Sequence, residues 1–268
     1  MNILIFDIGA SQTRYVMSNG RRFLNPPVIM KTPRSYNRMK TSWKKIRAHV
    51  GNVDRVVMGA AGPLDGRHAT LIGGNLPNWV HQSMRRDAEK IFRTRVILRN
   101  DAELGGLGEA RYGAGQGYNV VAFLTVSTGV GGAKIVGGNI DVSARGFEPG
   151  RQIIGFRKRP LILEELISGK ALKQKFHKYP WKITDQKVWQ ETAHWLALGL
   201  VNLSVLWSPD VIVLGGPMFK RPGIRIAEVR AELKKLLKIM PAPKILPAQL
   251  GDFCGLYGGM VAAKKSRS

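Results

Sequence analysis

Short apolar runs recur along the chain, and each ends in glycine, aspartate, asparagine or a hydroxyl residue. The runs cover residues 3–6, 53–58, 95–98, 119–125 and 211–214. Continuous apolar runs of this length, closed by turn-forming residues, are typical of buried sheet strands whose end loops carry polar groups. The pattern therefore predicts a buried sheet with polar loops at the strand ends.

Stretches with helical spacing lie between these runs. Residues 101–111 begin with the acidic Asp101 and Glu103, which suit the positive N-terminus of a helix. Residues 224–240 carry an apolar face opposite a basic one, and residues 185–207 repeat apolar side chains at helical spacing after an N-cap at Thr184 or Asp185. Strands and helices in alternation predict an α/β protein.

Composition limits the class of protein. The chain has 268 residues, of which 44% are hydrophobic and 22% charged, and this is an ordinary globular balance. Its only cysteine is Cys254, so an intrachain disulfide and a cysteine-based zinc site are both excluded, and a reducing compartment is favoured. Neither a signal peptide nor an apolar stretch of about 20 residues is evident. We expect a cytoplasmic protein without a membrane partner.

The charge is unusual. Lys and Arg together number 42 against 18 for Asp and Glu, which gives a formal net charge of +24. Such a field attracts polyanions. The basic residues are dispersed, however, and no base-reading motif appears, so we expect no specific nucleic-acid partner and only salt-dependent DNA binding.

The first candidate site follows the first apolar run. Gly9 permits a tight turn, and Ser11 and Thr13 offer hydroxyl and backbone N–H groups to a phosphate. Asp7 suits a Mg²⁺ ion, bound directly or through water. An ordinary β-hairpin turn with a buried aspartate explains the same residues equally well.

A second turn of the same kind comes about a hundred residues later. Ser127, Thr128 and Gly129 follow an apolar run, and glycines there let the backbone approach an anion. Two such turns predict a clamp for nucleotide phosphates. Gly215 and Gly216, after another run, are a third point of close approach, which suits the nucleoside.

The third candidate site lies between a predicted strand and a predicted helix. Asp101 there suits a general base that takes a proton from a substrate hydroxyl as it attacks a phosphate. A helix N-cap, formed by Asn100 or Asp101, is the simpler structural interpretation.

Taken together, these segments resemble the ROK family of glucokinase-like enzymes, within the actin, sugar-kinase and Hsp70 superfamily. The N-terminal turn, including Arg14, resembles the phosphate signature of that superfamily. Further segments occur in the order of the ROK family, at residues 61–66, 75–79, 100–102, 107–109, 113–115, 127–132, 163–169, 209–216 and 255–259.

The resemblance implies a two-domain, actin-like (ribonuclease H-like) ATPase fold with a cleft between the domains. A small N-terminal α/β domain would span residues 1–102 plus a returning helix within 252–268, and a large domain residues 103–251. ATP and Mg²⁺ would be the cofactors. Asp101 would be the catalytic base and would bind the sugar together with Asn75, Asn100, Glu148 and Glu164.

One motif departs from the family. Residues 147–151 read Phe-Glu-Pro-Gly-Arg, so Arg151 stands where the family has histidine, and the cysteine cluster that normally follows is missing. Zinc is therefore not expected. A guanidinium suits a carboxylate or phosphate better than a neutral hydroxyl, which suggests an acidic or phosphorylated sugar. An outward-facing structural replacement is the simpler interpretation.

The predicted function is ATP-dependent phosphorylation of a hexose, with glucokinase activity implied most directly. Alternatives are a glucokinase that uses polyphosphate, a kinase for an amino or acidic sugar, and a sugar-sensing regulator that lacks its own DNA-binding domain. A predicted helix carries Trp189, Trp195 and Trp207. We expect these to serve core packing, with a homodimer interface as the alternative.

Overall fold

The computed structural model describes residues 1–143 and 146–265. The chain splits into two compact units: the first comprises Met1–Arg111, Val142–Gly146 and Asp252–Ser268, and the second Tyr112–Asp141 and Phe147–Gly251. The division falls after Arg111, whereas the boundary expected from the sequence fell after residue 102. Helix α3 (Asp101–Tyr112) stays with the first unit because Gly108 lies against the backbone of Cys254, at the start of α8 (Cys254–Lys265).

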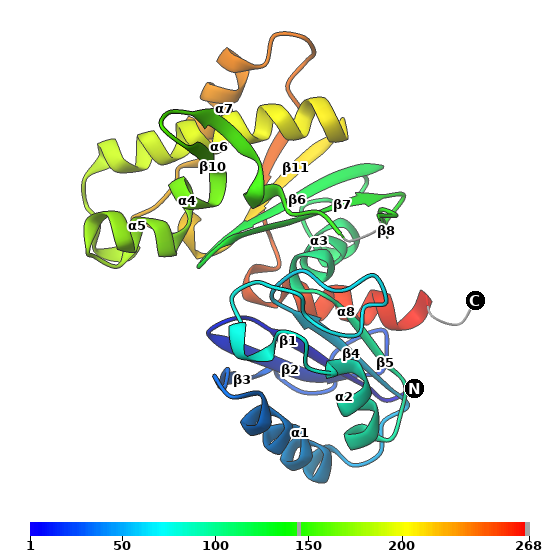
Figure 1. Ribbon diagram of the computed structural model, residues 1–268. Coiled ribbons are helices and arrows are strands. Elements are labelled where there is room, and N and C mark those ends of the chain that lie inside the picture. Colours follow the sequence, from blue (N-terminus) through cyan, green and yellow to red (C-terminus); the bar gives the residue numbers. More distant parts are fainter. Residues whose placement is uncertain (144–145, 266–268) are drawn as a thin grey trace. The chain divides into compact units, whose positions relative to one another are not determined.

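The first unit is built on a five-stranded sheet with the order β3-β2-β1-β4-β5 (Figure 1). Strands β1, β4 and β5 are parallel, and β2 and β3 extend the sheet in antiparallel pairing. The strands are β1 (Ile3–Ile8), β2 (Gln12–Ser18), β3 (Val28–Lys31), β4 (Arg55–Ala60) and β5 (Val96–Asn100).

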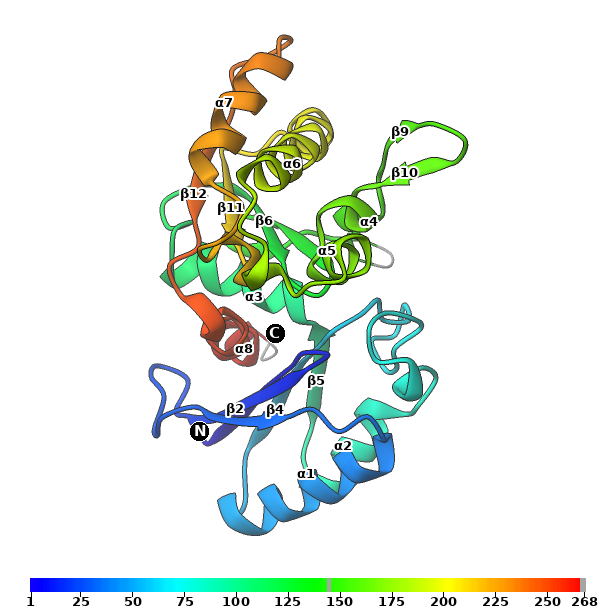
Figure 2. The same ribbon diagram turned by 90° about the vertical axis from the view of Figure 1, so that its left-hand side faces the viewer.

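Helices cover both faces of this sheet. Leu4, Phe6 and Ile8 alternate along β1 and pack in one cluster with buried residues of α1 (Tyr36–Val50) and α2 (Met84–Phe92), among them Trp43. Helix α8 covers the opposite face, where Gly259 lets its backbone come close to Ile5 (Figure 2). Because both faces are buried, β1 reads as a continuous apolar run.

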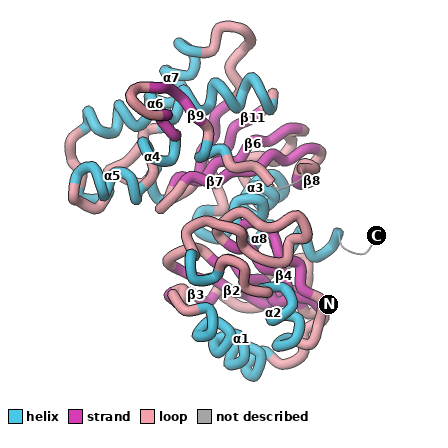
Figure 3. Tube along the Cα trace, viewed as in Figure 1, coloured by secondary structure: helices cyan, strands magenta, loops and turns pink. Residues whose placement is uncertain are grey.

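The second unit has its own five-stranded sheet, with the order β12-β11-β6-β7-β8. Helices and strands are coloured separately in Figure 3. Its strands are β6 (Val120–Val126), β7 (Val130–Val136), β8 (Asn139–Ile140), β11 (Val211–Gly215) and β12 (Lys244–Pro247). Its helices are α4 (Leu163–Ile167), α5 (Gly169–Phe176), α6 (Gln186–Trp207) and α7 (Ile226–Leu236).

Helix α6 confirms the longest helix predicted from the sequence. Asp185 is its N-cap, and the Asp185 carboxylate accepts a hydrogen bond from the Lys187 N–H at 2.9 Å. Trp189 is buried in the core of the second unit, and Trp195 and Trp207 pack against that core, as expected for packing residues. Among the described residues, no helix is long and apolar enough to cross a membrane.

Two predicted segments differ from the structure. Helix α7 begins at Ile226 and ends at Leu236, inside the predicted range of 224–240; Pro241 disfavours helix at Met240, the residue before it. The basic segment that follows Arg151 forms a β-hairpin of β9 (Ile153–Phe156) and β10 (Pro160–Ile162), which extends from the second unit (Figure 2). The sequence pattern did not predict this hairpin.

Candidate active site

The turn between β1 and β2 is a β-hairpin turn, closed by a hydrogen bond of 3.0 Å from the Gly9 N–H to the Gln12 carbonyl. Thr32 donates its hydroxyl to the Gly9 carbonyl at 2.8 Å, so the Thr13 hydroxyl, 2.9 Å away, must donate to Thr32. Thr13 is fully buried. The expectation that its hydroxyl faces a phosphate is therefore corrected: Thr13 holds the turn, while Ser11 is exposed.

Asp7 lies at the carboxyl end of β1 with its carboxylate against the backbone of Gly255, where a Cβ would come within 3.2 Å of Oδ1. Arg14 places a guanidinium nitrogen 3.6 Å from Oδ2. Burial, followed by the charge of Asp101, raises the pKa of Asp7 to about 7; Arg14 lowers this pKa and Asp252 raises it further. Asp7 is a partly buried carboxylate, 15% exposed, beside other acids, and a bound cation would stabilise its charged form.

Asn100 and Asp101 lie where β5 passes into α3. The Asn100 Oδ1 accepts hydrogen bonds from the N–H groups of Ala102 at 2.8 Å and Glu103 at 3.3 Å, so the N-cap interpretation is confirmed for Asn100. Its side-chain amide also donates to the Gly62 carbonyl at 2.9 Å. These bonds fix the position from which the next residue, Asp101, projects.

The Asp101 carboxylate is held by its own helix. Oδ1 accepts a hydrogen bond of 2.9 Å from the Ala102 N–H. Burial nevertheless raises the pKa of Asp101 to about 6; hydrogen bonds from the backbone lower it, and the charge of Glu103 raises it. The side chain is a carboxylate near neutral pH that keeps appreciable basicity.

Asn75 is exposed on the loop that precedes Leu76 and Pro77. The preceding residue, Gly74, packs against Gly62, whose carbonyl Asn100 binds. The loop that carries Asn75 is thus connected to Asn100 by packing and a hydrogen bond.

The residues around Asp7 fit Mg²⁺ in a limited way. Within residues 1–143 and 146–265, no cluster of three or more His, Cys, Asp or Glu side chains has the arrangement of a metal site. A magnesium ion here would be held by Asp7 together with water and phosphate oxygens, which is the coordination that Mg²⁺ commonly adopts with nucleotides.

The second unit contains the other predicted phosphate turn. Ser127, Thr128 and Gly129 form the tight connection between β6 and β7, closed by a bond of 2.8 Å from the Ser127 N–H to the Gly129 carbonyl. Helix α5 begins directly against it, where Gly169 donates to the Ser127 carbonyl at 2.8 Å. Gly216 has a φ of +100° and lies against the Val126 backbone, so it joins the same cluster.

Three predicted sugar residues lie nearby in the second unit. Arg151 and Glu164 meet in an ion pair, 3.2 Å from Nη2 to Oε1, and the other carboxylate oxygen of Glu164 accepts the Val130 N–H at 2.7 Å. Glu148 is exposed, and its carbonyl accepts the Arg151 N–H at 2.9 Å. Glu164 therefore contacts both Arg151 and the strand that leaves the phosphate turn.

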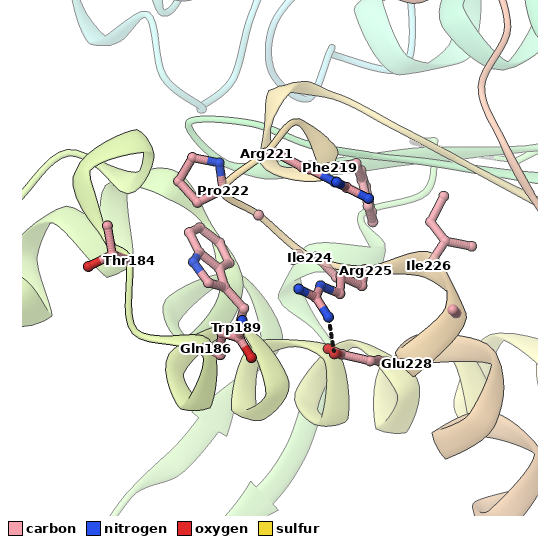
Figure 4. Close-up of a pocket in the computed structure, with 12 residues that line it drawn as sticks. Thr184, Gln186, Trp189, Phe219, Arg221, Pro222, Ile224, Arg225, Ile226 and Glu228 are labelled. Carbon is pink, nitrogen blue, oxygen red and sulfur yellow. Dashed lines mark ion pairs between the residues drawn. The ribbon is translucent and has the colours of Figure 1, made fainter.

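A pocket of about 550 Å³ opens in the second unit at the N-terminal ends of α6 and α7 (Figure 4). Trp189 and Phe219 supply aromatic side chains, and Arg225 and Glu228 form an ion pair at 3.7 Å on its wall. Phe219 ends the short 3-10 helix that directly follows Gly216. Phe219 therefore connects Gly216 along the chain to the wall of this pocket.

The sequence profile of the ROK family matches residues 36–266. The chain belongs to the ROK family. A glucokinase of Streptomyces coelicolor is 24% identical over 263 residues, covering 81% of this chain and 83% of the relative. An N-acetyl-D-glucosamine kinase of Escherichia coli is 26% identical over 294 residues, covering 94% of this chain and 96% of the relative.

The solved structures agree on the fold. A ROK family glucokinase from Streptomyces griseus, solved in complex with glucose and AMPPNP, superposes with a TM-score of 0.81 at 24% identity, covering 99% of this chain and 100% of that one. The actin-like two-domain α/β fold expected from the sequence is thereby confirmed for this ROK protein.

Several residues of the site were not predicted from the sequence. Asp252 acts on the pKa of Asp7, Thr32 bonds Thr13, and Gly62 holds Asn100 through its carbonyl. Gly62 lies within the family segment at residues 61–66, and Asp252 lies just before the segment at 255–259, so their positions were an available signal. Thr32 belongs to no such motif, and nothing in the sequence marks it.

Proposed function

We propose that this ROK protein transfers the γ-phosphate of ATP to a hydroxyl group of a hexose, with Asp101 as the general base. The observation that carries the proposal is the Asp101 carboxylate, which is partly buried at the start of α3 and whose pKa is raised to about 6. A base with this pKa is ionised at neutral pH and still accepts a proton from a hydroxyl as that group attacks phosphorus. Asn100, fixed by its cap bonds and by Gly62, would hold a neighbouring sugar hydroxyl.

The donor phosphates would be bound by both glycine-containing turns. In the first unit Gly9 and Ser11 would contribute the exposed turn, and Arg14 would supply a positive charge beside Asp7. Magnesium, held by Asp7 through water, would neutralise phosphate charge as it builds up during transfer.

In the second unit Ser127 and Thr128 would contact the phosphates through their hydroxyl groups, and Thr128 and Gly129 through backbone N–H groups. Gly215 and Gly216 would lie close to the nucleoside. The pocket that begins at Phe219 supports this placement, because its aromatic walls suit a flat heterocycle.

Glucose is the first substrate to test, because a glucokinase is among the relatives. N-acetylglucosamine is the second, because a relative of nearly full coverage is named for that sugar. Asn75, Asn100, Glu148 and Glu164 would supply the donors and acceptors for sugar hydroxyls, with Arg151 paired to Glu164 beside them. The single cysteine, Cys254, supports a reducing, cytoplasmic setting.

The test is release of ADP from Mg-ATP over a panel of neutral hexoses, N-acetylated amino sugars, sugar acids and sugar phosphates, with Asp101→Asn as the matched control. We expect turnover with at least one sugar, a loss of about 10³-fold or more in Asp101→Asn, and unchanged nucleotide binding. Polyphosphate is run beside ATP as an alternative donor. Sugar-dependent turnover that survives in Asp101→Asn would exclude Asp101 as the base.

A sugar sensor without catalysis is the competing outcome. It would bind sugar and nucleotide in calorimetry and release no ADP with any acceptor or donor in the panel. That result would reject the proposed kinase activity.

A further inference from the structure

Arg151 and Glu164 face each other at the base of the hairpin formed by β9 and β10. The next pair of residues inward, Gln152 and Leu163, is joined by a hydrogen bond of 3.1 Å from the Leu163 N–H to the Gln152 carbonyl. The hairpin therefore closes on the Arg151–Glu164 ion pair, and the two side chains are neighbours because their backbones are already held together.

Glu164 makes a second contact that reaches the phosphate turn. Its Oε2 accepts the N–H of Val130, the first residue of β7 after Gly129, at 2.7 Å. Gly150 packs on the same residue, since a Cβ at Gly150 would collide with the Val130 carbonyl oxygen. The segment that carries Arg151 thus lies directly on the strand that leaves the phosphate turn.

The segment that carries Arg151 is also held by helix α6. The Gln152 side chain donates to the Pro149 carbonyl at 2.8 Å and accepts a hydrogen bond from the Asn202 side chain, on α6, at 2.9 Å. Helix α6 packs on the core of the second unit, so the backbone at Arg151 has a fixed support. The geometry of the ion pair is consequently set by the fold and not by a flexible loop.

The charges balance within this pair. One oxygen of Glu164 contacts Arg151 and the other binds the Val130 N–H, while the Glu164 side chain is only 19% exposed. An anionic substrate that drew the guanidinium away would leave a partly buried carboxylate without its counter-ion, which costs free energy. Glu164 therefore retains the Arg151 guanidinium, although that side chain is 58% exposed.

We propose that Arg151 is a positioning residue: it holds Glu164 on the Val130 N–H and thereby fixes the exit of the phosphate turn. The positioning role rests on the structure alone, and its effect on turnover rests on the proposed kinase function. It differs from the hypothesis, raised by the sequence, that Arg151 recognises an acidic or phosphorylated sugar.

The positioning role is tested by amide hydrogen exchange of peptides that cover residues 126–131, which needs no turnover. Arg151→Gln should speed exchange at this turn about two- to fivefold, as expected for loss of a partly exposed ion pair. Glu164→Ala should speed it about tenfold or more, because the acceptor of the Val130 N–H is removed. The double variant should match Glu164→Ala, because Arg151 acts through Glu164.

A neighbouring ion pair supplies the control. Arg159 and Glu165 lie on and beside the same hairpin, 3.6 Å apart, with exposures of 78% and 43%. Arg159→Gln should leave exchange at residues 126–131 unchanged. Equal effects of Arg151→Gln and Arg159→Gln, or additive effects of the Arg151 and Glu164 variants, would overturn the positioning role.

The effect of Arg151 on turnover is tested with the same proteins. Arg151→Gln should raise the KM for both sugar and ATP, because Glu164 is held less firmly and the phosphate turn is loosened. Turnover of a sugar acid or sugar phosphate that Arg151→Gln abolishes would identify Arg151 as an anion receptor and reject the inference. Absence of turnover with every acceptor rejects the kinase function, while hydrogen exchange still decides the positioning role.

Discussion

The charge of Asp101 raises the pKa of Asp7, although strand β4 lies between the two strands that lead to these residues. Strands β1, β4 and β5 are parallel, so their carboxyl ends meet at one edge of the sheet. Gly59, on β4, occupies the position between them, and a Cβ there would lie 3.4 Å from the Cα of Asp101. Two acids thus share one buried edge, which favours a bound cation.

The pH dependence of turnover follows from Asp101. Its pKa is raised to about 6 by burial, and the base must be ionised to accept a proton. At saturating Mg-ATP, kcat/KM for the sugar should rise with pH and level off above an apparent pKa of about 6. A profile of initial rates from pH 5 to 8.5 checks this, and a flat profile would contradict it. Asp101→Asn should have low activity that does not rise with pH in this range.

The stability of the ligand-free protein should fall as pH rises through neutrality. The folded pKa of Asp7 is raised to about 7, so its favourable contribution is complete below its ordinary value of 3.8 and is lost as pH rises through 7. Asp7→Asn should therefore stabilise the protein at pH 8, by on the order of 2 kcal/mol, and much less at pH 5.

Urea unfolding at pH 5 and pH 8 measures this effect. Asp185→Asn is the matched control, since Asp185 is exposed and asparagine also serves as an N-cap. Mg²⁺ at pH 8 should stabilise the unaltered protein and not Asp7→Asn. Equal destabilisation by Asp7→Asn at both pH values would show that burial does not disfavour the charged form of the Asp7 carboxylate.

Substitutions of Thr13 and Ser11, the two hydroxyl residues of the first turn, should have different effects. Thr13→Val removes a buried hydrogen bond to Thr32 and should lower the free energy of unfolding by about 1 kcal/mol, with little change in the KM for ATP. Ser11→Ala should leave stability unchanged and raise the KM for ATP about tenfold, because the exposed hydroxyl would bind a charged phosphate.

Thermal or urea unfolding, run beside ATP kinetics, distinguishes the two variants. A tenfold rise in the KM for ATP in Thr13→Val, at unchanged stability, would indicate that the Thr13 hydroxyl does contact the phosphate. An unchanged KM for ATP in Ser11→Ala would indicate that the Ser11 hydroxyl does not.

Binding to DNA should be electrostatic and independent of sequence. With a net charge of +24, the affinity for a short duplex should fall by about 10³-fold or more between 50 and 200 mM salt, equally for unrelated sequences. Fluorescence anisotropy with two unrelated duplexes measures this. A sequence preference that persists at 200 mM salt would indicate a specific nucleic-acid role.

The sequence by itself determined the elements and most of the motif positions. Buried parallel strands read as apolar runs because both faces are covered, and Asp185 marked the start of α6 because an N-cap acts on residues two or three positions away. Such interactions are local or repeat with a fixed period. Asp101 could be placed at a strand end for the same reason.

Only the tertiary structure decided what each side chain contacts. Thr13 turns inward because Thr32, 19 residues away, accepts its hydroxyl, and Glu164 meets the N–H of Val130, 34 residues away. The raised pKa of Asp7 depends on burial beneath α8 and on the charge of Asp101. Burial and charge proximity depend on which distant segments pack together, and this packing cannot be predicted from a local pattern of residues.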